Sequence, residues 1–572
     1  MKFYLKIFKL FSKKNQINFF LIFLLQLFHA SLEIFSFILI FPILKVLVDP
    51  NFIDTLNLFL NQNLNINIFS KINSKDFVFI SSGLIVSLYF IKSIIILVIN
   101  FYIFRFIKNI KIYLSDKFLR SNLFNDHLNL ESSSVIIRTA FKDINSVCEN
   151  VVTSFLNSIT DIVLLIFILC FMFYIQPIGS TISFLSFATL VFLYSKITSG
   201  KIKKLTFIYQ KLNSKLIESI QNIHRNIKEI KIFKKEIFFL NIYQQHLTQA
   251  ENATNTYKFF HTLPKVIYEF IGIIIIIAFF LITLETTFAP QEVISQIGIV
   301  AICAFRIIPS ASKISANIIN MKYSKASVDV LYDSFKKLKN KFDTKKFNNK
   351  NFLKLNFYHV SFSYKNPYKL VFKDINLQIN KGEKIAIVGR SGVGKTTFLE
   401  IMCGLMPLDT GKIIIHSDNN ETFNTKVDFF TYVSQNVILV EDTIKSNIAF
   451  GIEEKLIDNS KISKVCEVAN LSNFINGLKN KLDTQIGELG SRLSGGQKQR
   501  ISIARALYFN REIIILDEAT SALDFQTEKE ILNNIKINYP LKTIIIISHR
   551  KTSLNFCDRI LNLEDYQISE KF

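Results

Sequence analysis

The sequence predicts a membrane all-α domain with six transmembrane helices, followed by an α/β domain. Three observations lead to this fold class. Six long apolar runs precede residue 321, and hydrophobic residues make up 49% of the 572-residue chain. Basic residues gather between some of these runs and not between others. Twelve of the 17 glycines follow residue 380, where short β-like runs such as KIAIVG, KIIIH and TIIIISH alternate with helical stretches, as in α/β domains with largely parallel sheets.

Each apolar run is long enough to cross a hydrocarbon layer of about 30 Å. Short turns, YIQPIGS and ETTFAPQE, separate the third run from the fourth and the fifth from the sixth. The other two internal connections, 108–149 and 199–263, are long, basic and poor in helix breakers, so we expect the helices to continue into them. The six runs lie at 17–48, 77–107, 150–176, 179–198, 264–285 and 291–320.

The basic residues predict the orientation in the membrane. They concentrate at the N-terminus and in the two long connections, which places these parts and everything after about residue 321 in the cytoplasm. The formal net charge of +23 is also compatible with a nucleic-acid-binding surface. However, the lysines flank apolar runs, which favours contact with anionic membrane lipid, and we expect no nucleic-acid partner.

The remaining features of the chain mark its domain borders and compartment. The six cysteines are scattered without metal-ligand spacing, which argues against a disulfide framework or a zinc site. The basic start MKFYLKIFKLFSKKNQ lacks a small-residue cleavage site, so we expect no cleaved signal peptide. The predicted organisation is a transmembrane domain over 1–325, a charged helix and polar linker over 326–351, and the α/β domain over 352–572.

The segment GRSGVGKTT follows the predicted strand KIAIV and leads into the helix FLEIMCGL. It is the phosphate-binding loop G-x-x-x-x-G-K-[ST] in the strand–loop–helix context that the motif requires. We expect its backbone amides to wrap the phosphates of ATP, Lys395 to reach the β- and γ-phosphates, and Thr396 to bind Mg²⁺. The expected nucleotide-binding residues of this loop are Gly389, Arg390, Ser391, Gly392, Val393, Gly394, Lys395, Thr396 and Thr397.

A second motif, EIIILDEAT at 512–520, predicts a buried strand that ends in two acids. Asp517 can hold Mg²⁺ directly or through water. Glu518 follows it, where a carboxylate can polarise the water that attacks the γ-phosphate. A strand ending in acids is common by itself, but together with the phosphate loop it predicts ATP hydrolysis.

The segment LSGGQKQR at 493–500 completes the pattern, and with the two motifs above it makes residues of about 352–565 resemble ATP-binding cassette (ABC) proteins. The resemblance implies that Tyr364 in VSFSY stacks on adenine. It implies that Gln435 in YVSQN touches Mg²⁺ and water, and that His549 in IISHR contacts the γ-phosphate. It also implies that a partner's ATP is contacted by the signature and the D-loop acid, which are Ser494, Gly495, Gly496, Gln497 and Asp524.

One copy of each motif cannot build the head-to-tail sandwich that this resemblance implies, so two chains are needed. No motif is degenerate, which favours a homodimer over a heterodimer. Six spans followed by a cassette resemble a type IV ABC exporter half-transporter, a multi-pass protein of the bacterial inner membrane that works by alternating access. A membrane-anchored ABC ATPase with a regulatory role is a remote alternative, because neither a second cassette nor a nucleic-acid module is visible.

Ionisable residues at spanning depth point to the cargo. A central arginine costs about 2.5–3.5 kcal/mol on insertion scales, so such residues usually face a watery cavity or a partner. In the run VAICAFRIIPSASKISANII, Arg306 precedes a helix-kinking Pro309, and Lys313 follows two turns later. We expect Arg306, Lys313, Lys92 and Glu33 to contact substrate. The open alternative is that Arg306 only pairs with Glu269 or Glu33.

The stretches SLEIFSFILIFPIL, YEFIGI and FRIIPSASKI resemble the bacterial flippases of lipid-linked oligosaccharide for protein N-glycosylation. That resemblance implies a polyprenyl-pyrophosphate oligosaccharide as cargo, a lipid-linked anionic substrate moved to the outer leaflet at the expense of ATP. A lipid A or other glycolipid flippase, a multidrug exporter and a peptide exporter are the alternatives.

Overall fold

The computed structural model describes residues 2–39, 46, 74–124, 132–175, 177–286, 290–336, 352–365, 368–417, 422–424, 429–564 and 566–571. The chain divides into two compact units, which we call the helical unit and the α/β unit. The helical unit comprises residues 1–125 and 130–340, and the α/β unit comprises residues 126–129 and 341–572. The border after residue 340 falls inside the predicted linker 326–351.

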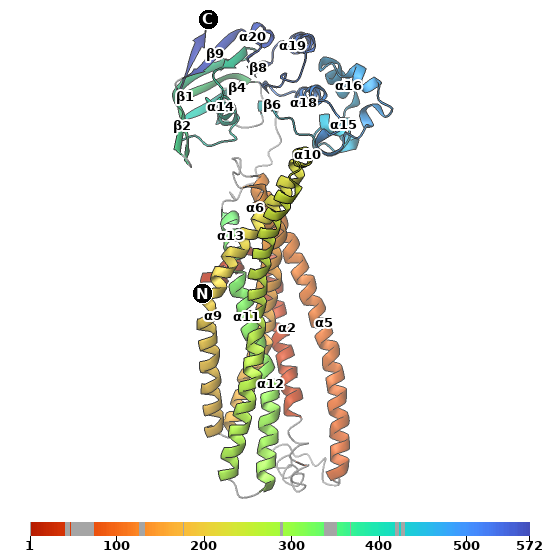
Figure 1. The fold of residues 1–572 in the computed structure, drawn as a ribbon. Coiled ribbons are helices and arrows are strands. Elements are labelled where there is room, and N and C mark those ends of the chain that lie inside the picture. Colours follow the sequence, from red (N-terminus) through yellow and green to blue (C-terminus); the bar gives the residue numbers. More distant parts are fainter. Residues whose placement is uncertain are drawn as a thin grey trace. The chain divides into compact units, whose positions relative to one another are not determined.

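Within its described residues the helical unit contains six long helices, which run side by side (Figure 1). Each contains most of the described part of one predicted apolar run. Residues 150–152 of the third run lie in the π-helical η2, and residues 40–45 and 47–48 of the first run lie outside the described residues. The helices are α2 (Lys13–Ile38), α5 (Ser74–Leu123), α8 (Thr153–Ile175), α9 (Pro177–Arg225), α11 (Glu236–Thr286) and α12 (Pro290–Tyr323).

The long helices extend well beyond their apolar runs, as the basic connections predicted. Helices α5, α9 and α11 have 50, 49 and 51 residues. At 1.5 Å per residue each is about 75 Å long, more than twice a hydrocarbon layer. Helix α12 continues through Pro309, which lies inside it.

Large apolar side chains cover the outer surface of α5. Phe79, Phe90 and Phe104 are 78%, 69% and 67% exposed, which is too much apolar surface for a protein in water. Three helical segments within the described residues are long and apolar enough to cross a membrane, namely Lys13–Ser36, Asp76–Leu123 and Ser133–Tyr174. These features fit a membrane environment.

Short helices connect the long ones or flank them. Helix α1 packs against α13 through an ion pair between Lys6 and Asp329, and the Lys6 ammonium also lies over the ring of Tyr332. Helix α13 lies where the charged helix was predicted at the start of 326–351, whereas α1 was not predicted. The short helical elements are α1 (Lys2–Leu10), α6 (Ser133–Arg138), η1 (Thr139–Asp143), α7 (Ile144–Ser146), η2 (Val147–Val152), α10 (Ile227–Ile232) and α13 (Lys325–Lys336), with η1 and η2 π-helical.

A polar seam joins the α7–α8 stretch to α12 and the residue that follows it. Three side-chain hydrogen bonds make up this seam. They join Ser324 and Ser146 at 2.7 Å, Asn320 and Ser154 at 3.2 Å, and Asn317 and Ser158 at 3.0 Å. The bonded residues are three or four positions apart on the α12 side, and eight and four positions apart on the α7–α8 side. The three bonds together hold the two segments in one register.

The α/β unit contains two sheets. The first has the order β2-β1-β4-β5 and is antiparallel. Its strands are β1 (Phe352–Lys365), β2 (Tyr368–Asn380), β4 (Thr410–Ser417) and β5 (Thr422–Asn424). The run KIIIH was predicted within a largely parallel sheet, but it lies in β4 of this antiparallel sheet. The reason is that β1 and β2 are separated by two residues, which permits only an antiparallel hairpin beside which β4 adds.

The second sheet has the order β10-β9-β3-β8-β7-β6 and positions the motif loops. Its strands β9, β3, β8, β7 and β6 are parallel, and β7 and β8 are buried along their whole length. In such sheets ligands bind at the carboxyl ends of the strands. The strands are β3 (Lys384–Val388), β6 (Phe430–Val433), β7 (Ile513–Asp517), β8 (Thr543–Ile547), β9 (Arg559–Glu564) and β10 (Gln567–Lys571).

Helices cover this sheet, and a helical subdomain extends from it (Figure 1). Two apolar cores result, one between the two sheets around Phe372 and Phe398, the other around α16 and α18. The helices are α14 (Lys395–Met402), α15 (Ile444–Ile448), α16 (Asn459–Val468), α17 (Ser472–Asn476), α18 (Gly495–Phe509), α19 (Phe525–Asn538) and α20 (Lys551–Phe556), with 3₁₀ turns at Glu454–Leu456, Lys481–Asp483 and Glu488–Gly490.

Candidate functional site

The phosphate loop lies between β3 and the N-terminus of α14. Two of its glycines are required by the backbone. Gly389 has φ +151°, and a Cβ there would lie 2.5 Å from the carbonyl oxygen of Leu563. Gly394 has φ +110°, and a Cβ there would lie 2.2 Å from Cγ1 of Val371. Only glycine fits this turn, which presents the amides of the helix N-terminus to an anion.

Lys395 reaches back across the loop. Its Nζ donates to the carbonyl oxygens of Gly389 at 2.7 Å and Arg390 at 3.1 Å, and it lies 3.4 Å from Nε2 of His549. Burial lowers the pKa of Lys395, while the charges of Glu518 and Asp517 act in the opposite direction. The ammonium therefore lies inside the loop, where phosphate oxygens can replace the carbonyls as its acceptors.

The acids of the second motif lie at the carboxyl end of β7, beside the loop. Thr396 Oγ1 donates to Asp517 Oδ2 at 3.2 Å, and the hydroxyl of Tyr432 donates to the same oxygen at 2.7 Å. Burial raises the pKa of Asp517, while these two hydrogen bonds act to lower it. Tyr432, at the end of β6, was not predicted as a site residue. The signal for it was its position three residues before Gln435, at the start of the YVSQN motif.

Glu518 is held in an uncommon backbone conformation. Its φ is +46°, a left-handed conformation that side chains other than glycine rarely adopt and that is frequent at active sites. Its amide donates to the carbonyl oxygen of Ile547 at 3.0 Å, which ties it to the end of β8. Its carboxylate accepts a hydrogen bond from Gln435 Nε2 at 2.6 Å. Six predicted residues therefore meet at one place, namely Lys395, Thr396, Gln435, Asp517, Glu518 and His549.

The oxygen atoms at this place suit Mg²⁺, which prefers hydroxyl, amide and carboxylate oxygens and phosphates. Thr396, Gln435 and Asp517 supply one of each kind. Within the described residues, no cluster of three or more His, Cys, Asp or Glu side chains could hold a metal. The residues therefore fit a magnesium ion that is held mainly by nucleotide phosphates.

Tyr364 lies next to the phosphate loop. Its hydroxyl is 3.0 Å from Thr397 Oγ1, and its ring packs edge-on against Phe362 with ring centroids 5.2 Å apart. The phenol is thus anchored beside the first turn of α14. Stacking of Tyr364 on adenine stays a prediction.

The signature residues form a separate group at the start of α18. Ser494 caps the helix, since its Oγ accepts from Gln497 N while its own amide donates to Gln497 Oε1 at 2.9 Å. A Cβ on Gly496 would lie 3.2 Å from the carbonyl oxygen of Ala522, so the D-loop packs directly against this turn. Asp524 caps α19 by accepting from Thr527 N at 2.9 Å. These hydrogen bonds join the signature and the D-loop to their own helices, and not to the phosphate loop.

The buried carboxylate of Glu528 is linked through Arg550, the residue after His549, to the D-loop segment SALD at 521–524. Glu528 is fully buried and accepts hydrogen bonds from Ser553 at 2.6 Å and Arg550 at 3.1 Å. Arg550 also donates to the carbonyl oxygens of Leu523 and Ser521. None of these residues was predicted, and their only sequence signal is their closeness to SALD and IISHR.

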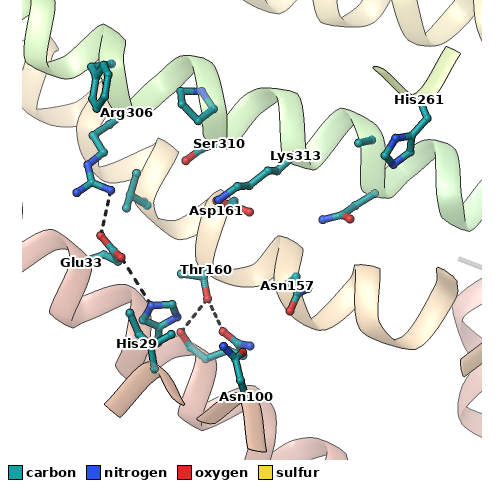
Figure 2. Close-up of a pocket in the computed structure, with 17 residues that line it drawn as sticks. His29, Glu33, Asn100, Asn157, Thr160, Asp161, His261, Arg306, Ser310 and Lys313 are labelled. Atoms are coloured by element: carbon teal, nitrogen blue, oxygen red, sulfur yellow. Dashed lines mark hydrogen bonds and ion pairs between the residues drawn. The ribbon is translucent and has the colours of Figure 1, made fainter. Parts of the chain in front are cut away.

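The helical unit contains a polar pocket of about 510 Å³ (Figure 2). Helices α2, α5, α8, α11 and α12 contribute to its wall. The predicted substrate residues Glu33, Arg306 and Lys313 line it, whereas Lys92 lies behind Glu33 and does not. The other polar residues of the wall are Gln26, His29, Asn100, Asn157, Thr160, Asp161, His261, Ser310 and Asn317.

The charges in the pocket are largely paired. Arg306 Nη1 lies 3.4 Å from Glu33 Oε2, and Lys313 is close enough to Asp161 to interact with its charge. Figure 2 shows Arg306 and Glu33 pointing toward one another and Lys313 beside Asp161. Of the two predicted partners of Arg306, Glu269 and Glu33, it is Glu33 that pairs with it in the structure. The predicted substrate residue Arg306 is therefore paired with a carboxylate within the protein, as expected where an unpaired cation is costly.

The polar residues of the pocket share a pattern that the sequence contains. On α8 they are Asn157, Thr160 and Asp161, and on α12 they are Arg306, Ser310, Lys313 and Asn317. Spacings of three and four place them on one helix face. Scanning the apolar runs for polar residues at helical spacing, and not only for charges, would have found them.

Comparisons with known proteins agree with both units. Residues 372–521 match the family model described as ABC transporter. A multidrug export ATP-binding/permease protein of Staphylococcus aureus is 40% identical over 215 residues. An ATP-dependent lipid A-core flippase of Vibrio parahaemolyticus is 39% identical over 214 residues, and one of Coxiella burnetii 42% over 214. These alignments cover 37% of this chain and only 36–37% of each relative.

A solved structure extends the likeness to nearly the whole chain. The structure of a bacterial Atm1-family ABC exporter with ATP bound matches with a TM-score of 0.77 and covers 98% of this chain and 94% of that one. Only 18% of the aligned residues are identical, so the likeness concerns the fold. The predicted fold class is confirmed: this chain has the fold of an ABC exporter, with a helical membrane domain followed by an α/β ABC ATPase domain.

Proposed function

We propose that this protein is a half-transporter that hydrolyses ATP and uses the energy to flip or export an amphipathic substrate across a membrane. The observation that carries the proposal is the meeting of six residues in the segments that follow the four parallel strands β3, β6, β7 and β8, namely Lys395, Thr396, Gln435, Asp517, Glu518 and His549. This is the set of groups that ATP hydrolysis needs. The ABC transporter match and the exporter fold support it.

In the proposed reaction each residue has a distinct task. Lys395 and the loop amides bind the β- and γ-phosphates, and Thr396, Gln435 and Asp517 hold Mg²⁺. The bound ion would neutralise charge on the phosphates. Glu518 accepts a hydrogen bond from the attacking water, and Gln435, bonded to Glu518 at 2.6 Å, orients that carboxylate. His549 lies next to the Lys395 ammonium, where it can donate to the γ-phosphate.

We propose that two copies of the chain form the working unit, with the plasma membrane of a bacterial cell as its location and the α/β unit in the cytoplasm. The signature serine and the phosphate loop belong to separate groups within one chain. A head-to-tail homodimer would bring Ser494 of each copy to the ATP of the other. The complete motif set in this chain supports identical partners.

For the substrate, we propose a lipid with a polar, anionic head group, and as the specific candidate a polyprenyl-pyrophosphate oligosaccharide. The pocket supports a hydrated head group because polar side chains form most of its wall, and its amides, hydroxyls and carboxylates suit sugar hydroxyls. Arg306 suits phosphate oxygens. The relatives named as lipid A-core flippases make a glycolipid the second candidate, and the multidrug relatives make a drug the third.

The test is transport by the purified protein in liposomes. ATP-dependent flipping of a polyprenyl-pyrophosphate oligosaccharide is compared with flipping of lipid A and with export of a drug-like cation. The Glu518→Gln variant serves as the non-hydrolysing control. We expect the oligosaccharide lipid to be flipped fastest and only by the wild-type protein. Hydrolysis without flipping of this lipid contradicts the specific candidate, and flipping of lipid A instead selects the second.

A further inference from the structure

A charge cluster beside the pocket contains two cations for one carboxylate. Lys92 Nζ lies 2.8 Å from Glu33 Oε2, and Arg306 Nη1 lies 3.4 Å from the same oxygen. Glu33 comes from α2, Lys92 from α5 and Arg306 from α12. Among these three side chains, two positive charges face one negative charge, which gives them a net charge of +1.

The two cations are held differently. The Lys92 side chain is 7% exposed, and its ammonium also lies over the ring of Tyr89 at 4.5 Å. The Arg306 side chain is 36% exposed and lines the pocket, and its second contact, to the Tyr89 hydroxyl, is long at 3.4 Å. Lys92 is thus the buried partner of Glu33, and Arg306 is the partner that faces the substrate space.

This asymmetry allows Arg306 to exchange partners. A guanidinium has five N–H donors; Arg306 donates one of them to the Tyr89 hydroxyl at 3.4 Å, and its contact with Glu33 is an ion pair at 3.4 Å. If an oxyanion takes the place of Glu33 on Arg306, Glu33 still has Lys92, so no charge is left unpaired. The incoming oxyanion also balances the net positive charge of Lys92, Arg306 and Glu33.

We propose that Glu33 is an internal counter-anion that the head group of the cargo displaces from Arg306, so that the pocket selects head groups with two or more negative charges, such as a diphosphate. This rests on the proposed transport of an anionic lipid. A monoanion would replace one carboxylate with an equivalent charge and gain little, because Glu33 is tethered beside Arg306 at high effective concentration. A diphosphate brings more charge and more oxygens for bidentate binding.

The chain offers a clean reporter for this exchange. It contains no tryptophan, and Phe305 lines the pocket and is 79% exposed. In a Phe305→Trp protein, fluorescence therefore reports on the pocket alone. The probes are a polyprenol, its monophosphate and its diphosphate, each in phosphatidylcholine nanodiscs without ATP, and inorganic pyrophosphate in solution. Three probes share one tail and differ only in head-group charge.

We expect the Phe305→Trp protein to bind the lipid diphosphate about tenfold more tightly than the monophosphate, as for a bidentate over a single charged contact. Adding Glu33→Gln should tighten monophosphate binding about tenfold and close this gap, because the competing charge is gone. Adding Arg306→Gln, alone or with Glu33→Gln, should reduce both phosphates to the level of the polyprenol. Asp116→Asn, in an exposed ion pair with Arg120 on α5, is the matched control and should change nothing.

The outcomes separate the two proposals. If the Phe305→Trp protein binds neither phosphate better than the polyprenol, the anionic lipid substrate is wrong and the exchange falls with it. If it binds the diphosphate but Glu33→Gln leaves monophosphate binding unchanged or weaker, only the exchange is wrong. Equal binding of inorganic pyrophosphate and the lipid diphosphate would overturn the lipid head group as the occupant. A circular dichroism spectrum that matches that of the wild-type protein shows that each variant is folded.

Discussion

The nucleotide site and the membrane pocket are assembled by different means. In the α/β unit, the backbone places the groups: loops at the carboxyl ends of neighbouring parallel strands carry contiguous motifs, and glycines such as Gly389 fit where no other residue would. In the helical unit, single side chains from five helices converge, and ion pairs such as Glu33–Arg306 compensate each other's burial. Backbone placement makes a site recognisable in sequence, whereas side-chain convergence makes its specificity adjustable.

This difference has a consequence for mutation. A nucleotide site placed by the backbone should lose its chemistry when one group is changed, without a change in the fold. A pocket held by paired charges should instead respond to each change with a redistribution of partners. The following predictions test that contrast, beginning with the largest effect.

Glu518→Gln should lower ATP hydrolysis about 100-fold or more, the range for loss of a general base, while ATP binding persists. The phosphate contacts of Lys395 and the loop are untouched by this change. Turnover and nucleotide binding of the purified protein measure the two effects. Glu512→Gln is the matched control at the other end of β7, where Glu512 only pairs with Lys542 at 3.0 Å, and it should keep near-normal turnover. Normal turnover in Glu518→Gln would assign the base to another residue.

Glu528→Gln and Asp143→Asn compare a buried carboxylate in each unit. Asp143 is 3% exposed and accepts hydrogen bonds from Ser327 at 2.8 Å and Arg138 at 3.1 Å. Removing one charge of such a buried pair costs about 3 kcal/mol. We expect each variant to raise amide hydrogen exchange in its own unit, measured by mass spectrometry, and to leave the other unit unchanged. Faster exchange in both units from one variant would show that the units do not unfold independently.

Tyr432→Phe should have the smallest effect and tests a residue outside the motifs. Its hydroxyl donates to Asp517 and so acts against the burial that raises the pKa of that carboxyl. Without it the pKa rises further, so Asp517 is protonated, and loses its Mg²⁺ affinity, at a higher pH. We expect the acid limb of the ATPase pH profile to move to higher pH, with about threefold lower activity at neutral pH.

The matched control is Tyr508→Phe, since the Tyr508 hydroxyl accepts from the amide of Asp458 away from the nucleotide site. Its pH profile should coincide with that of the wild-type protein. A Tyr432→Phe profile that also coincides would mean that the contiguous motifs alone tune Asp517.

The sequence allowed prediction of the motif residues around Lys395 and Glu518 because each motif is local: a strand, its loop and the next helix are neighbours in the chain. Tyr432, Arg550 and Glu528 were missed because their roles depend on which strands lie side by side in the sheet. In the helical unit the apolar runs predicted the helices. The pairing of Arg306 with Glu33 required knowing which faces of α2 and α12 meet, and hydrophobic periodicity does not specify that.

The hydrogen bonds that join Ser146, Ser154 and Ser158 to the last turns of α12 have a mechanical consequence. If one segment slid along the other, all three hydrogen bonds would break at once. The small serine side chains also let the two helices pack closely, which opposes a gradual shift. The two segments should therefore move together as one rigid body. A displacement of residue 324 should therefore also move the pocket wall at Asn157 and Asn317. This pair of helices couples the C-terminal end of α12 to the polar pocket.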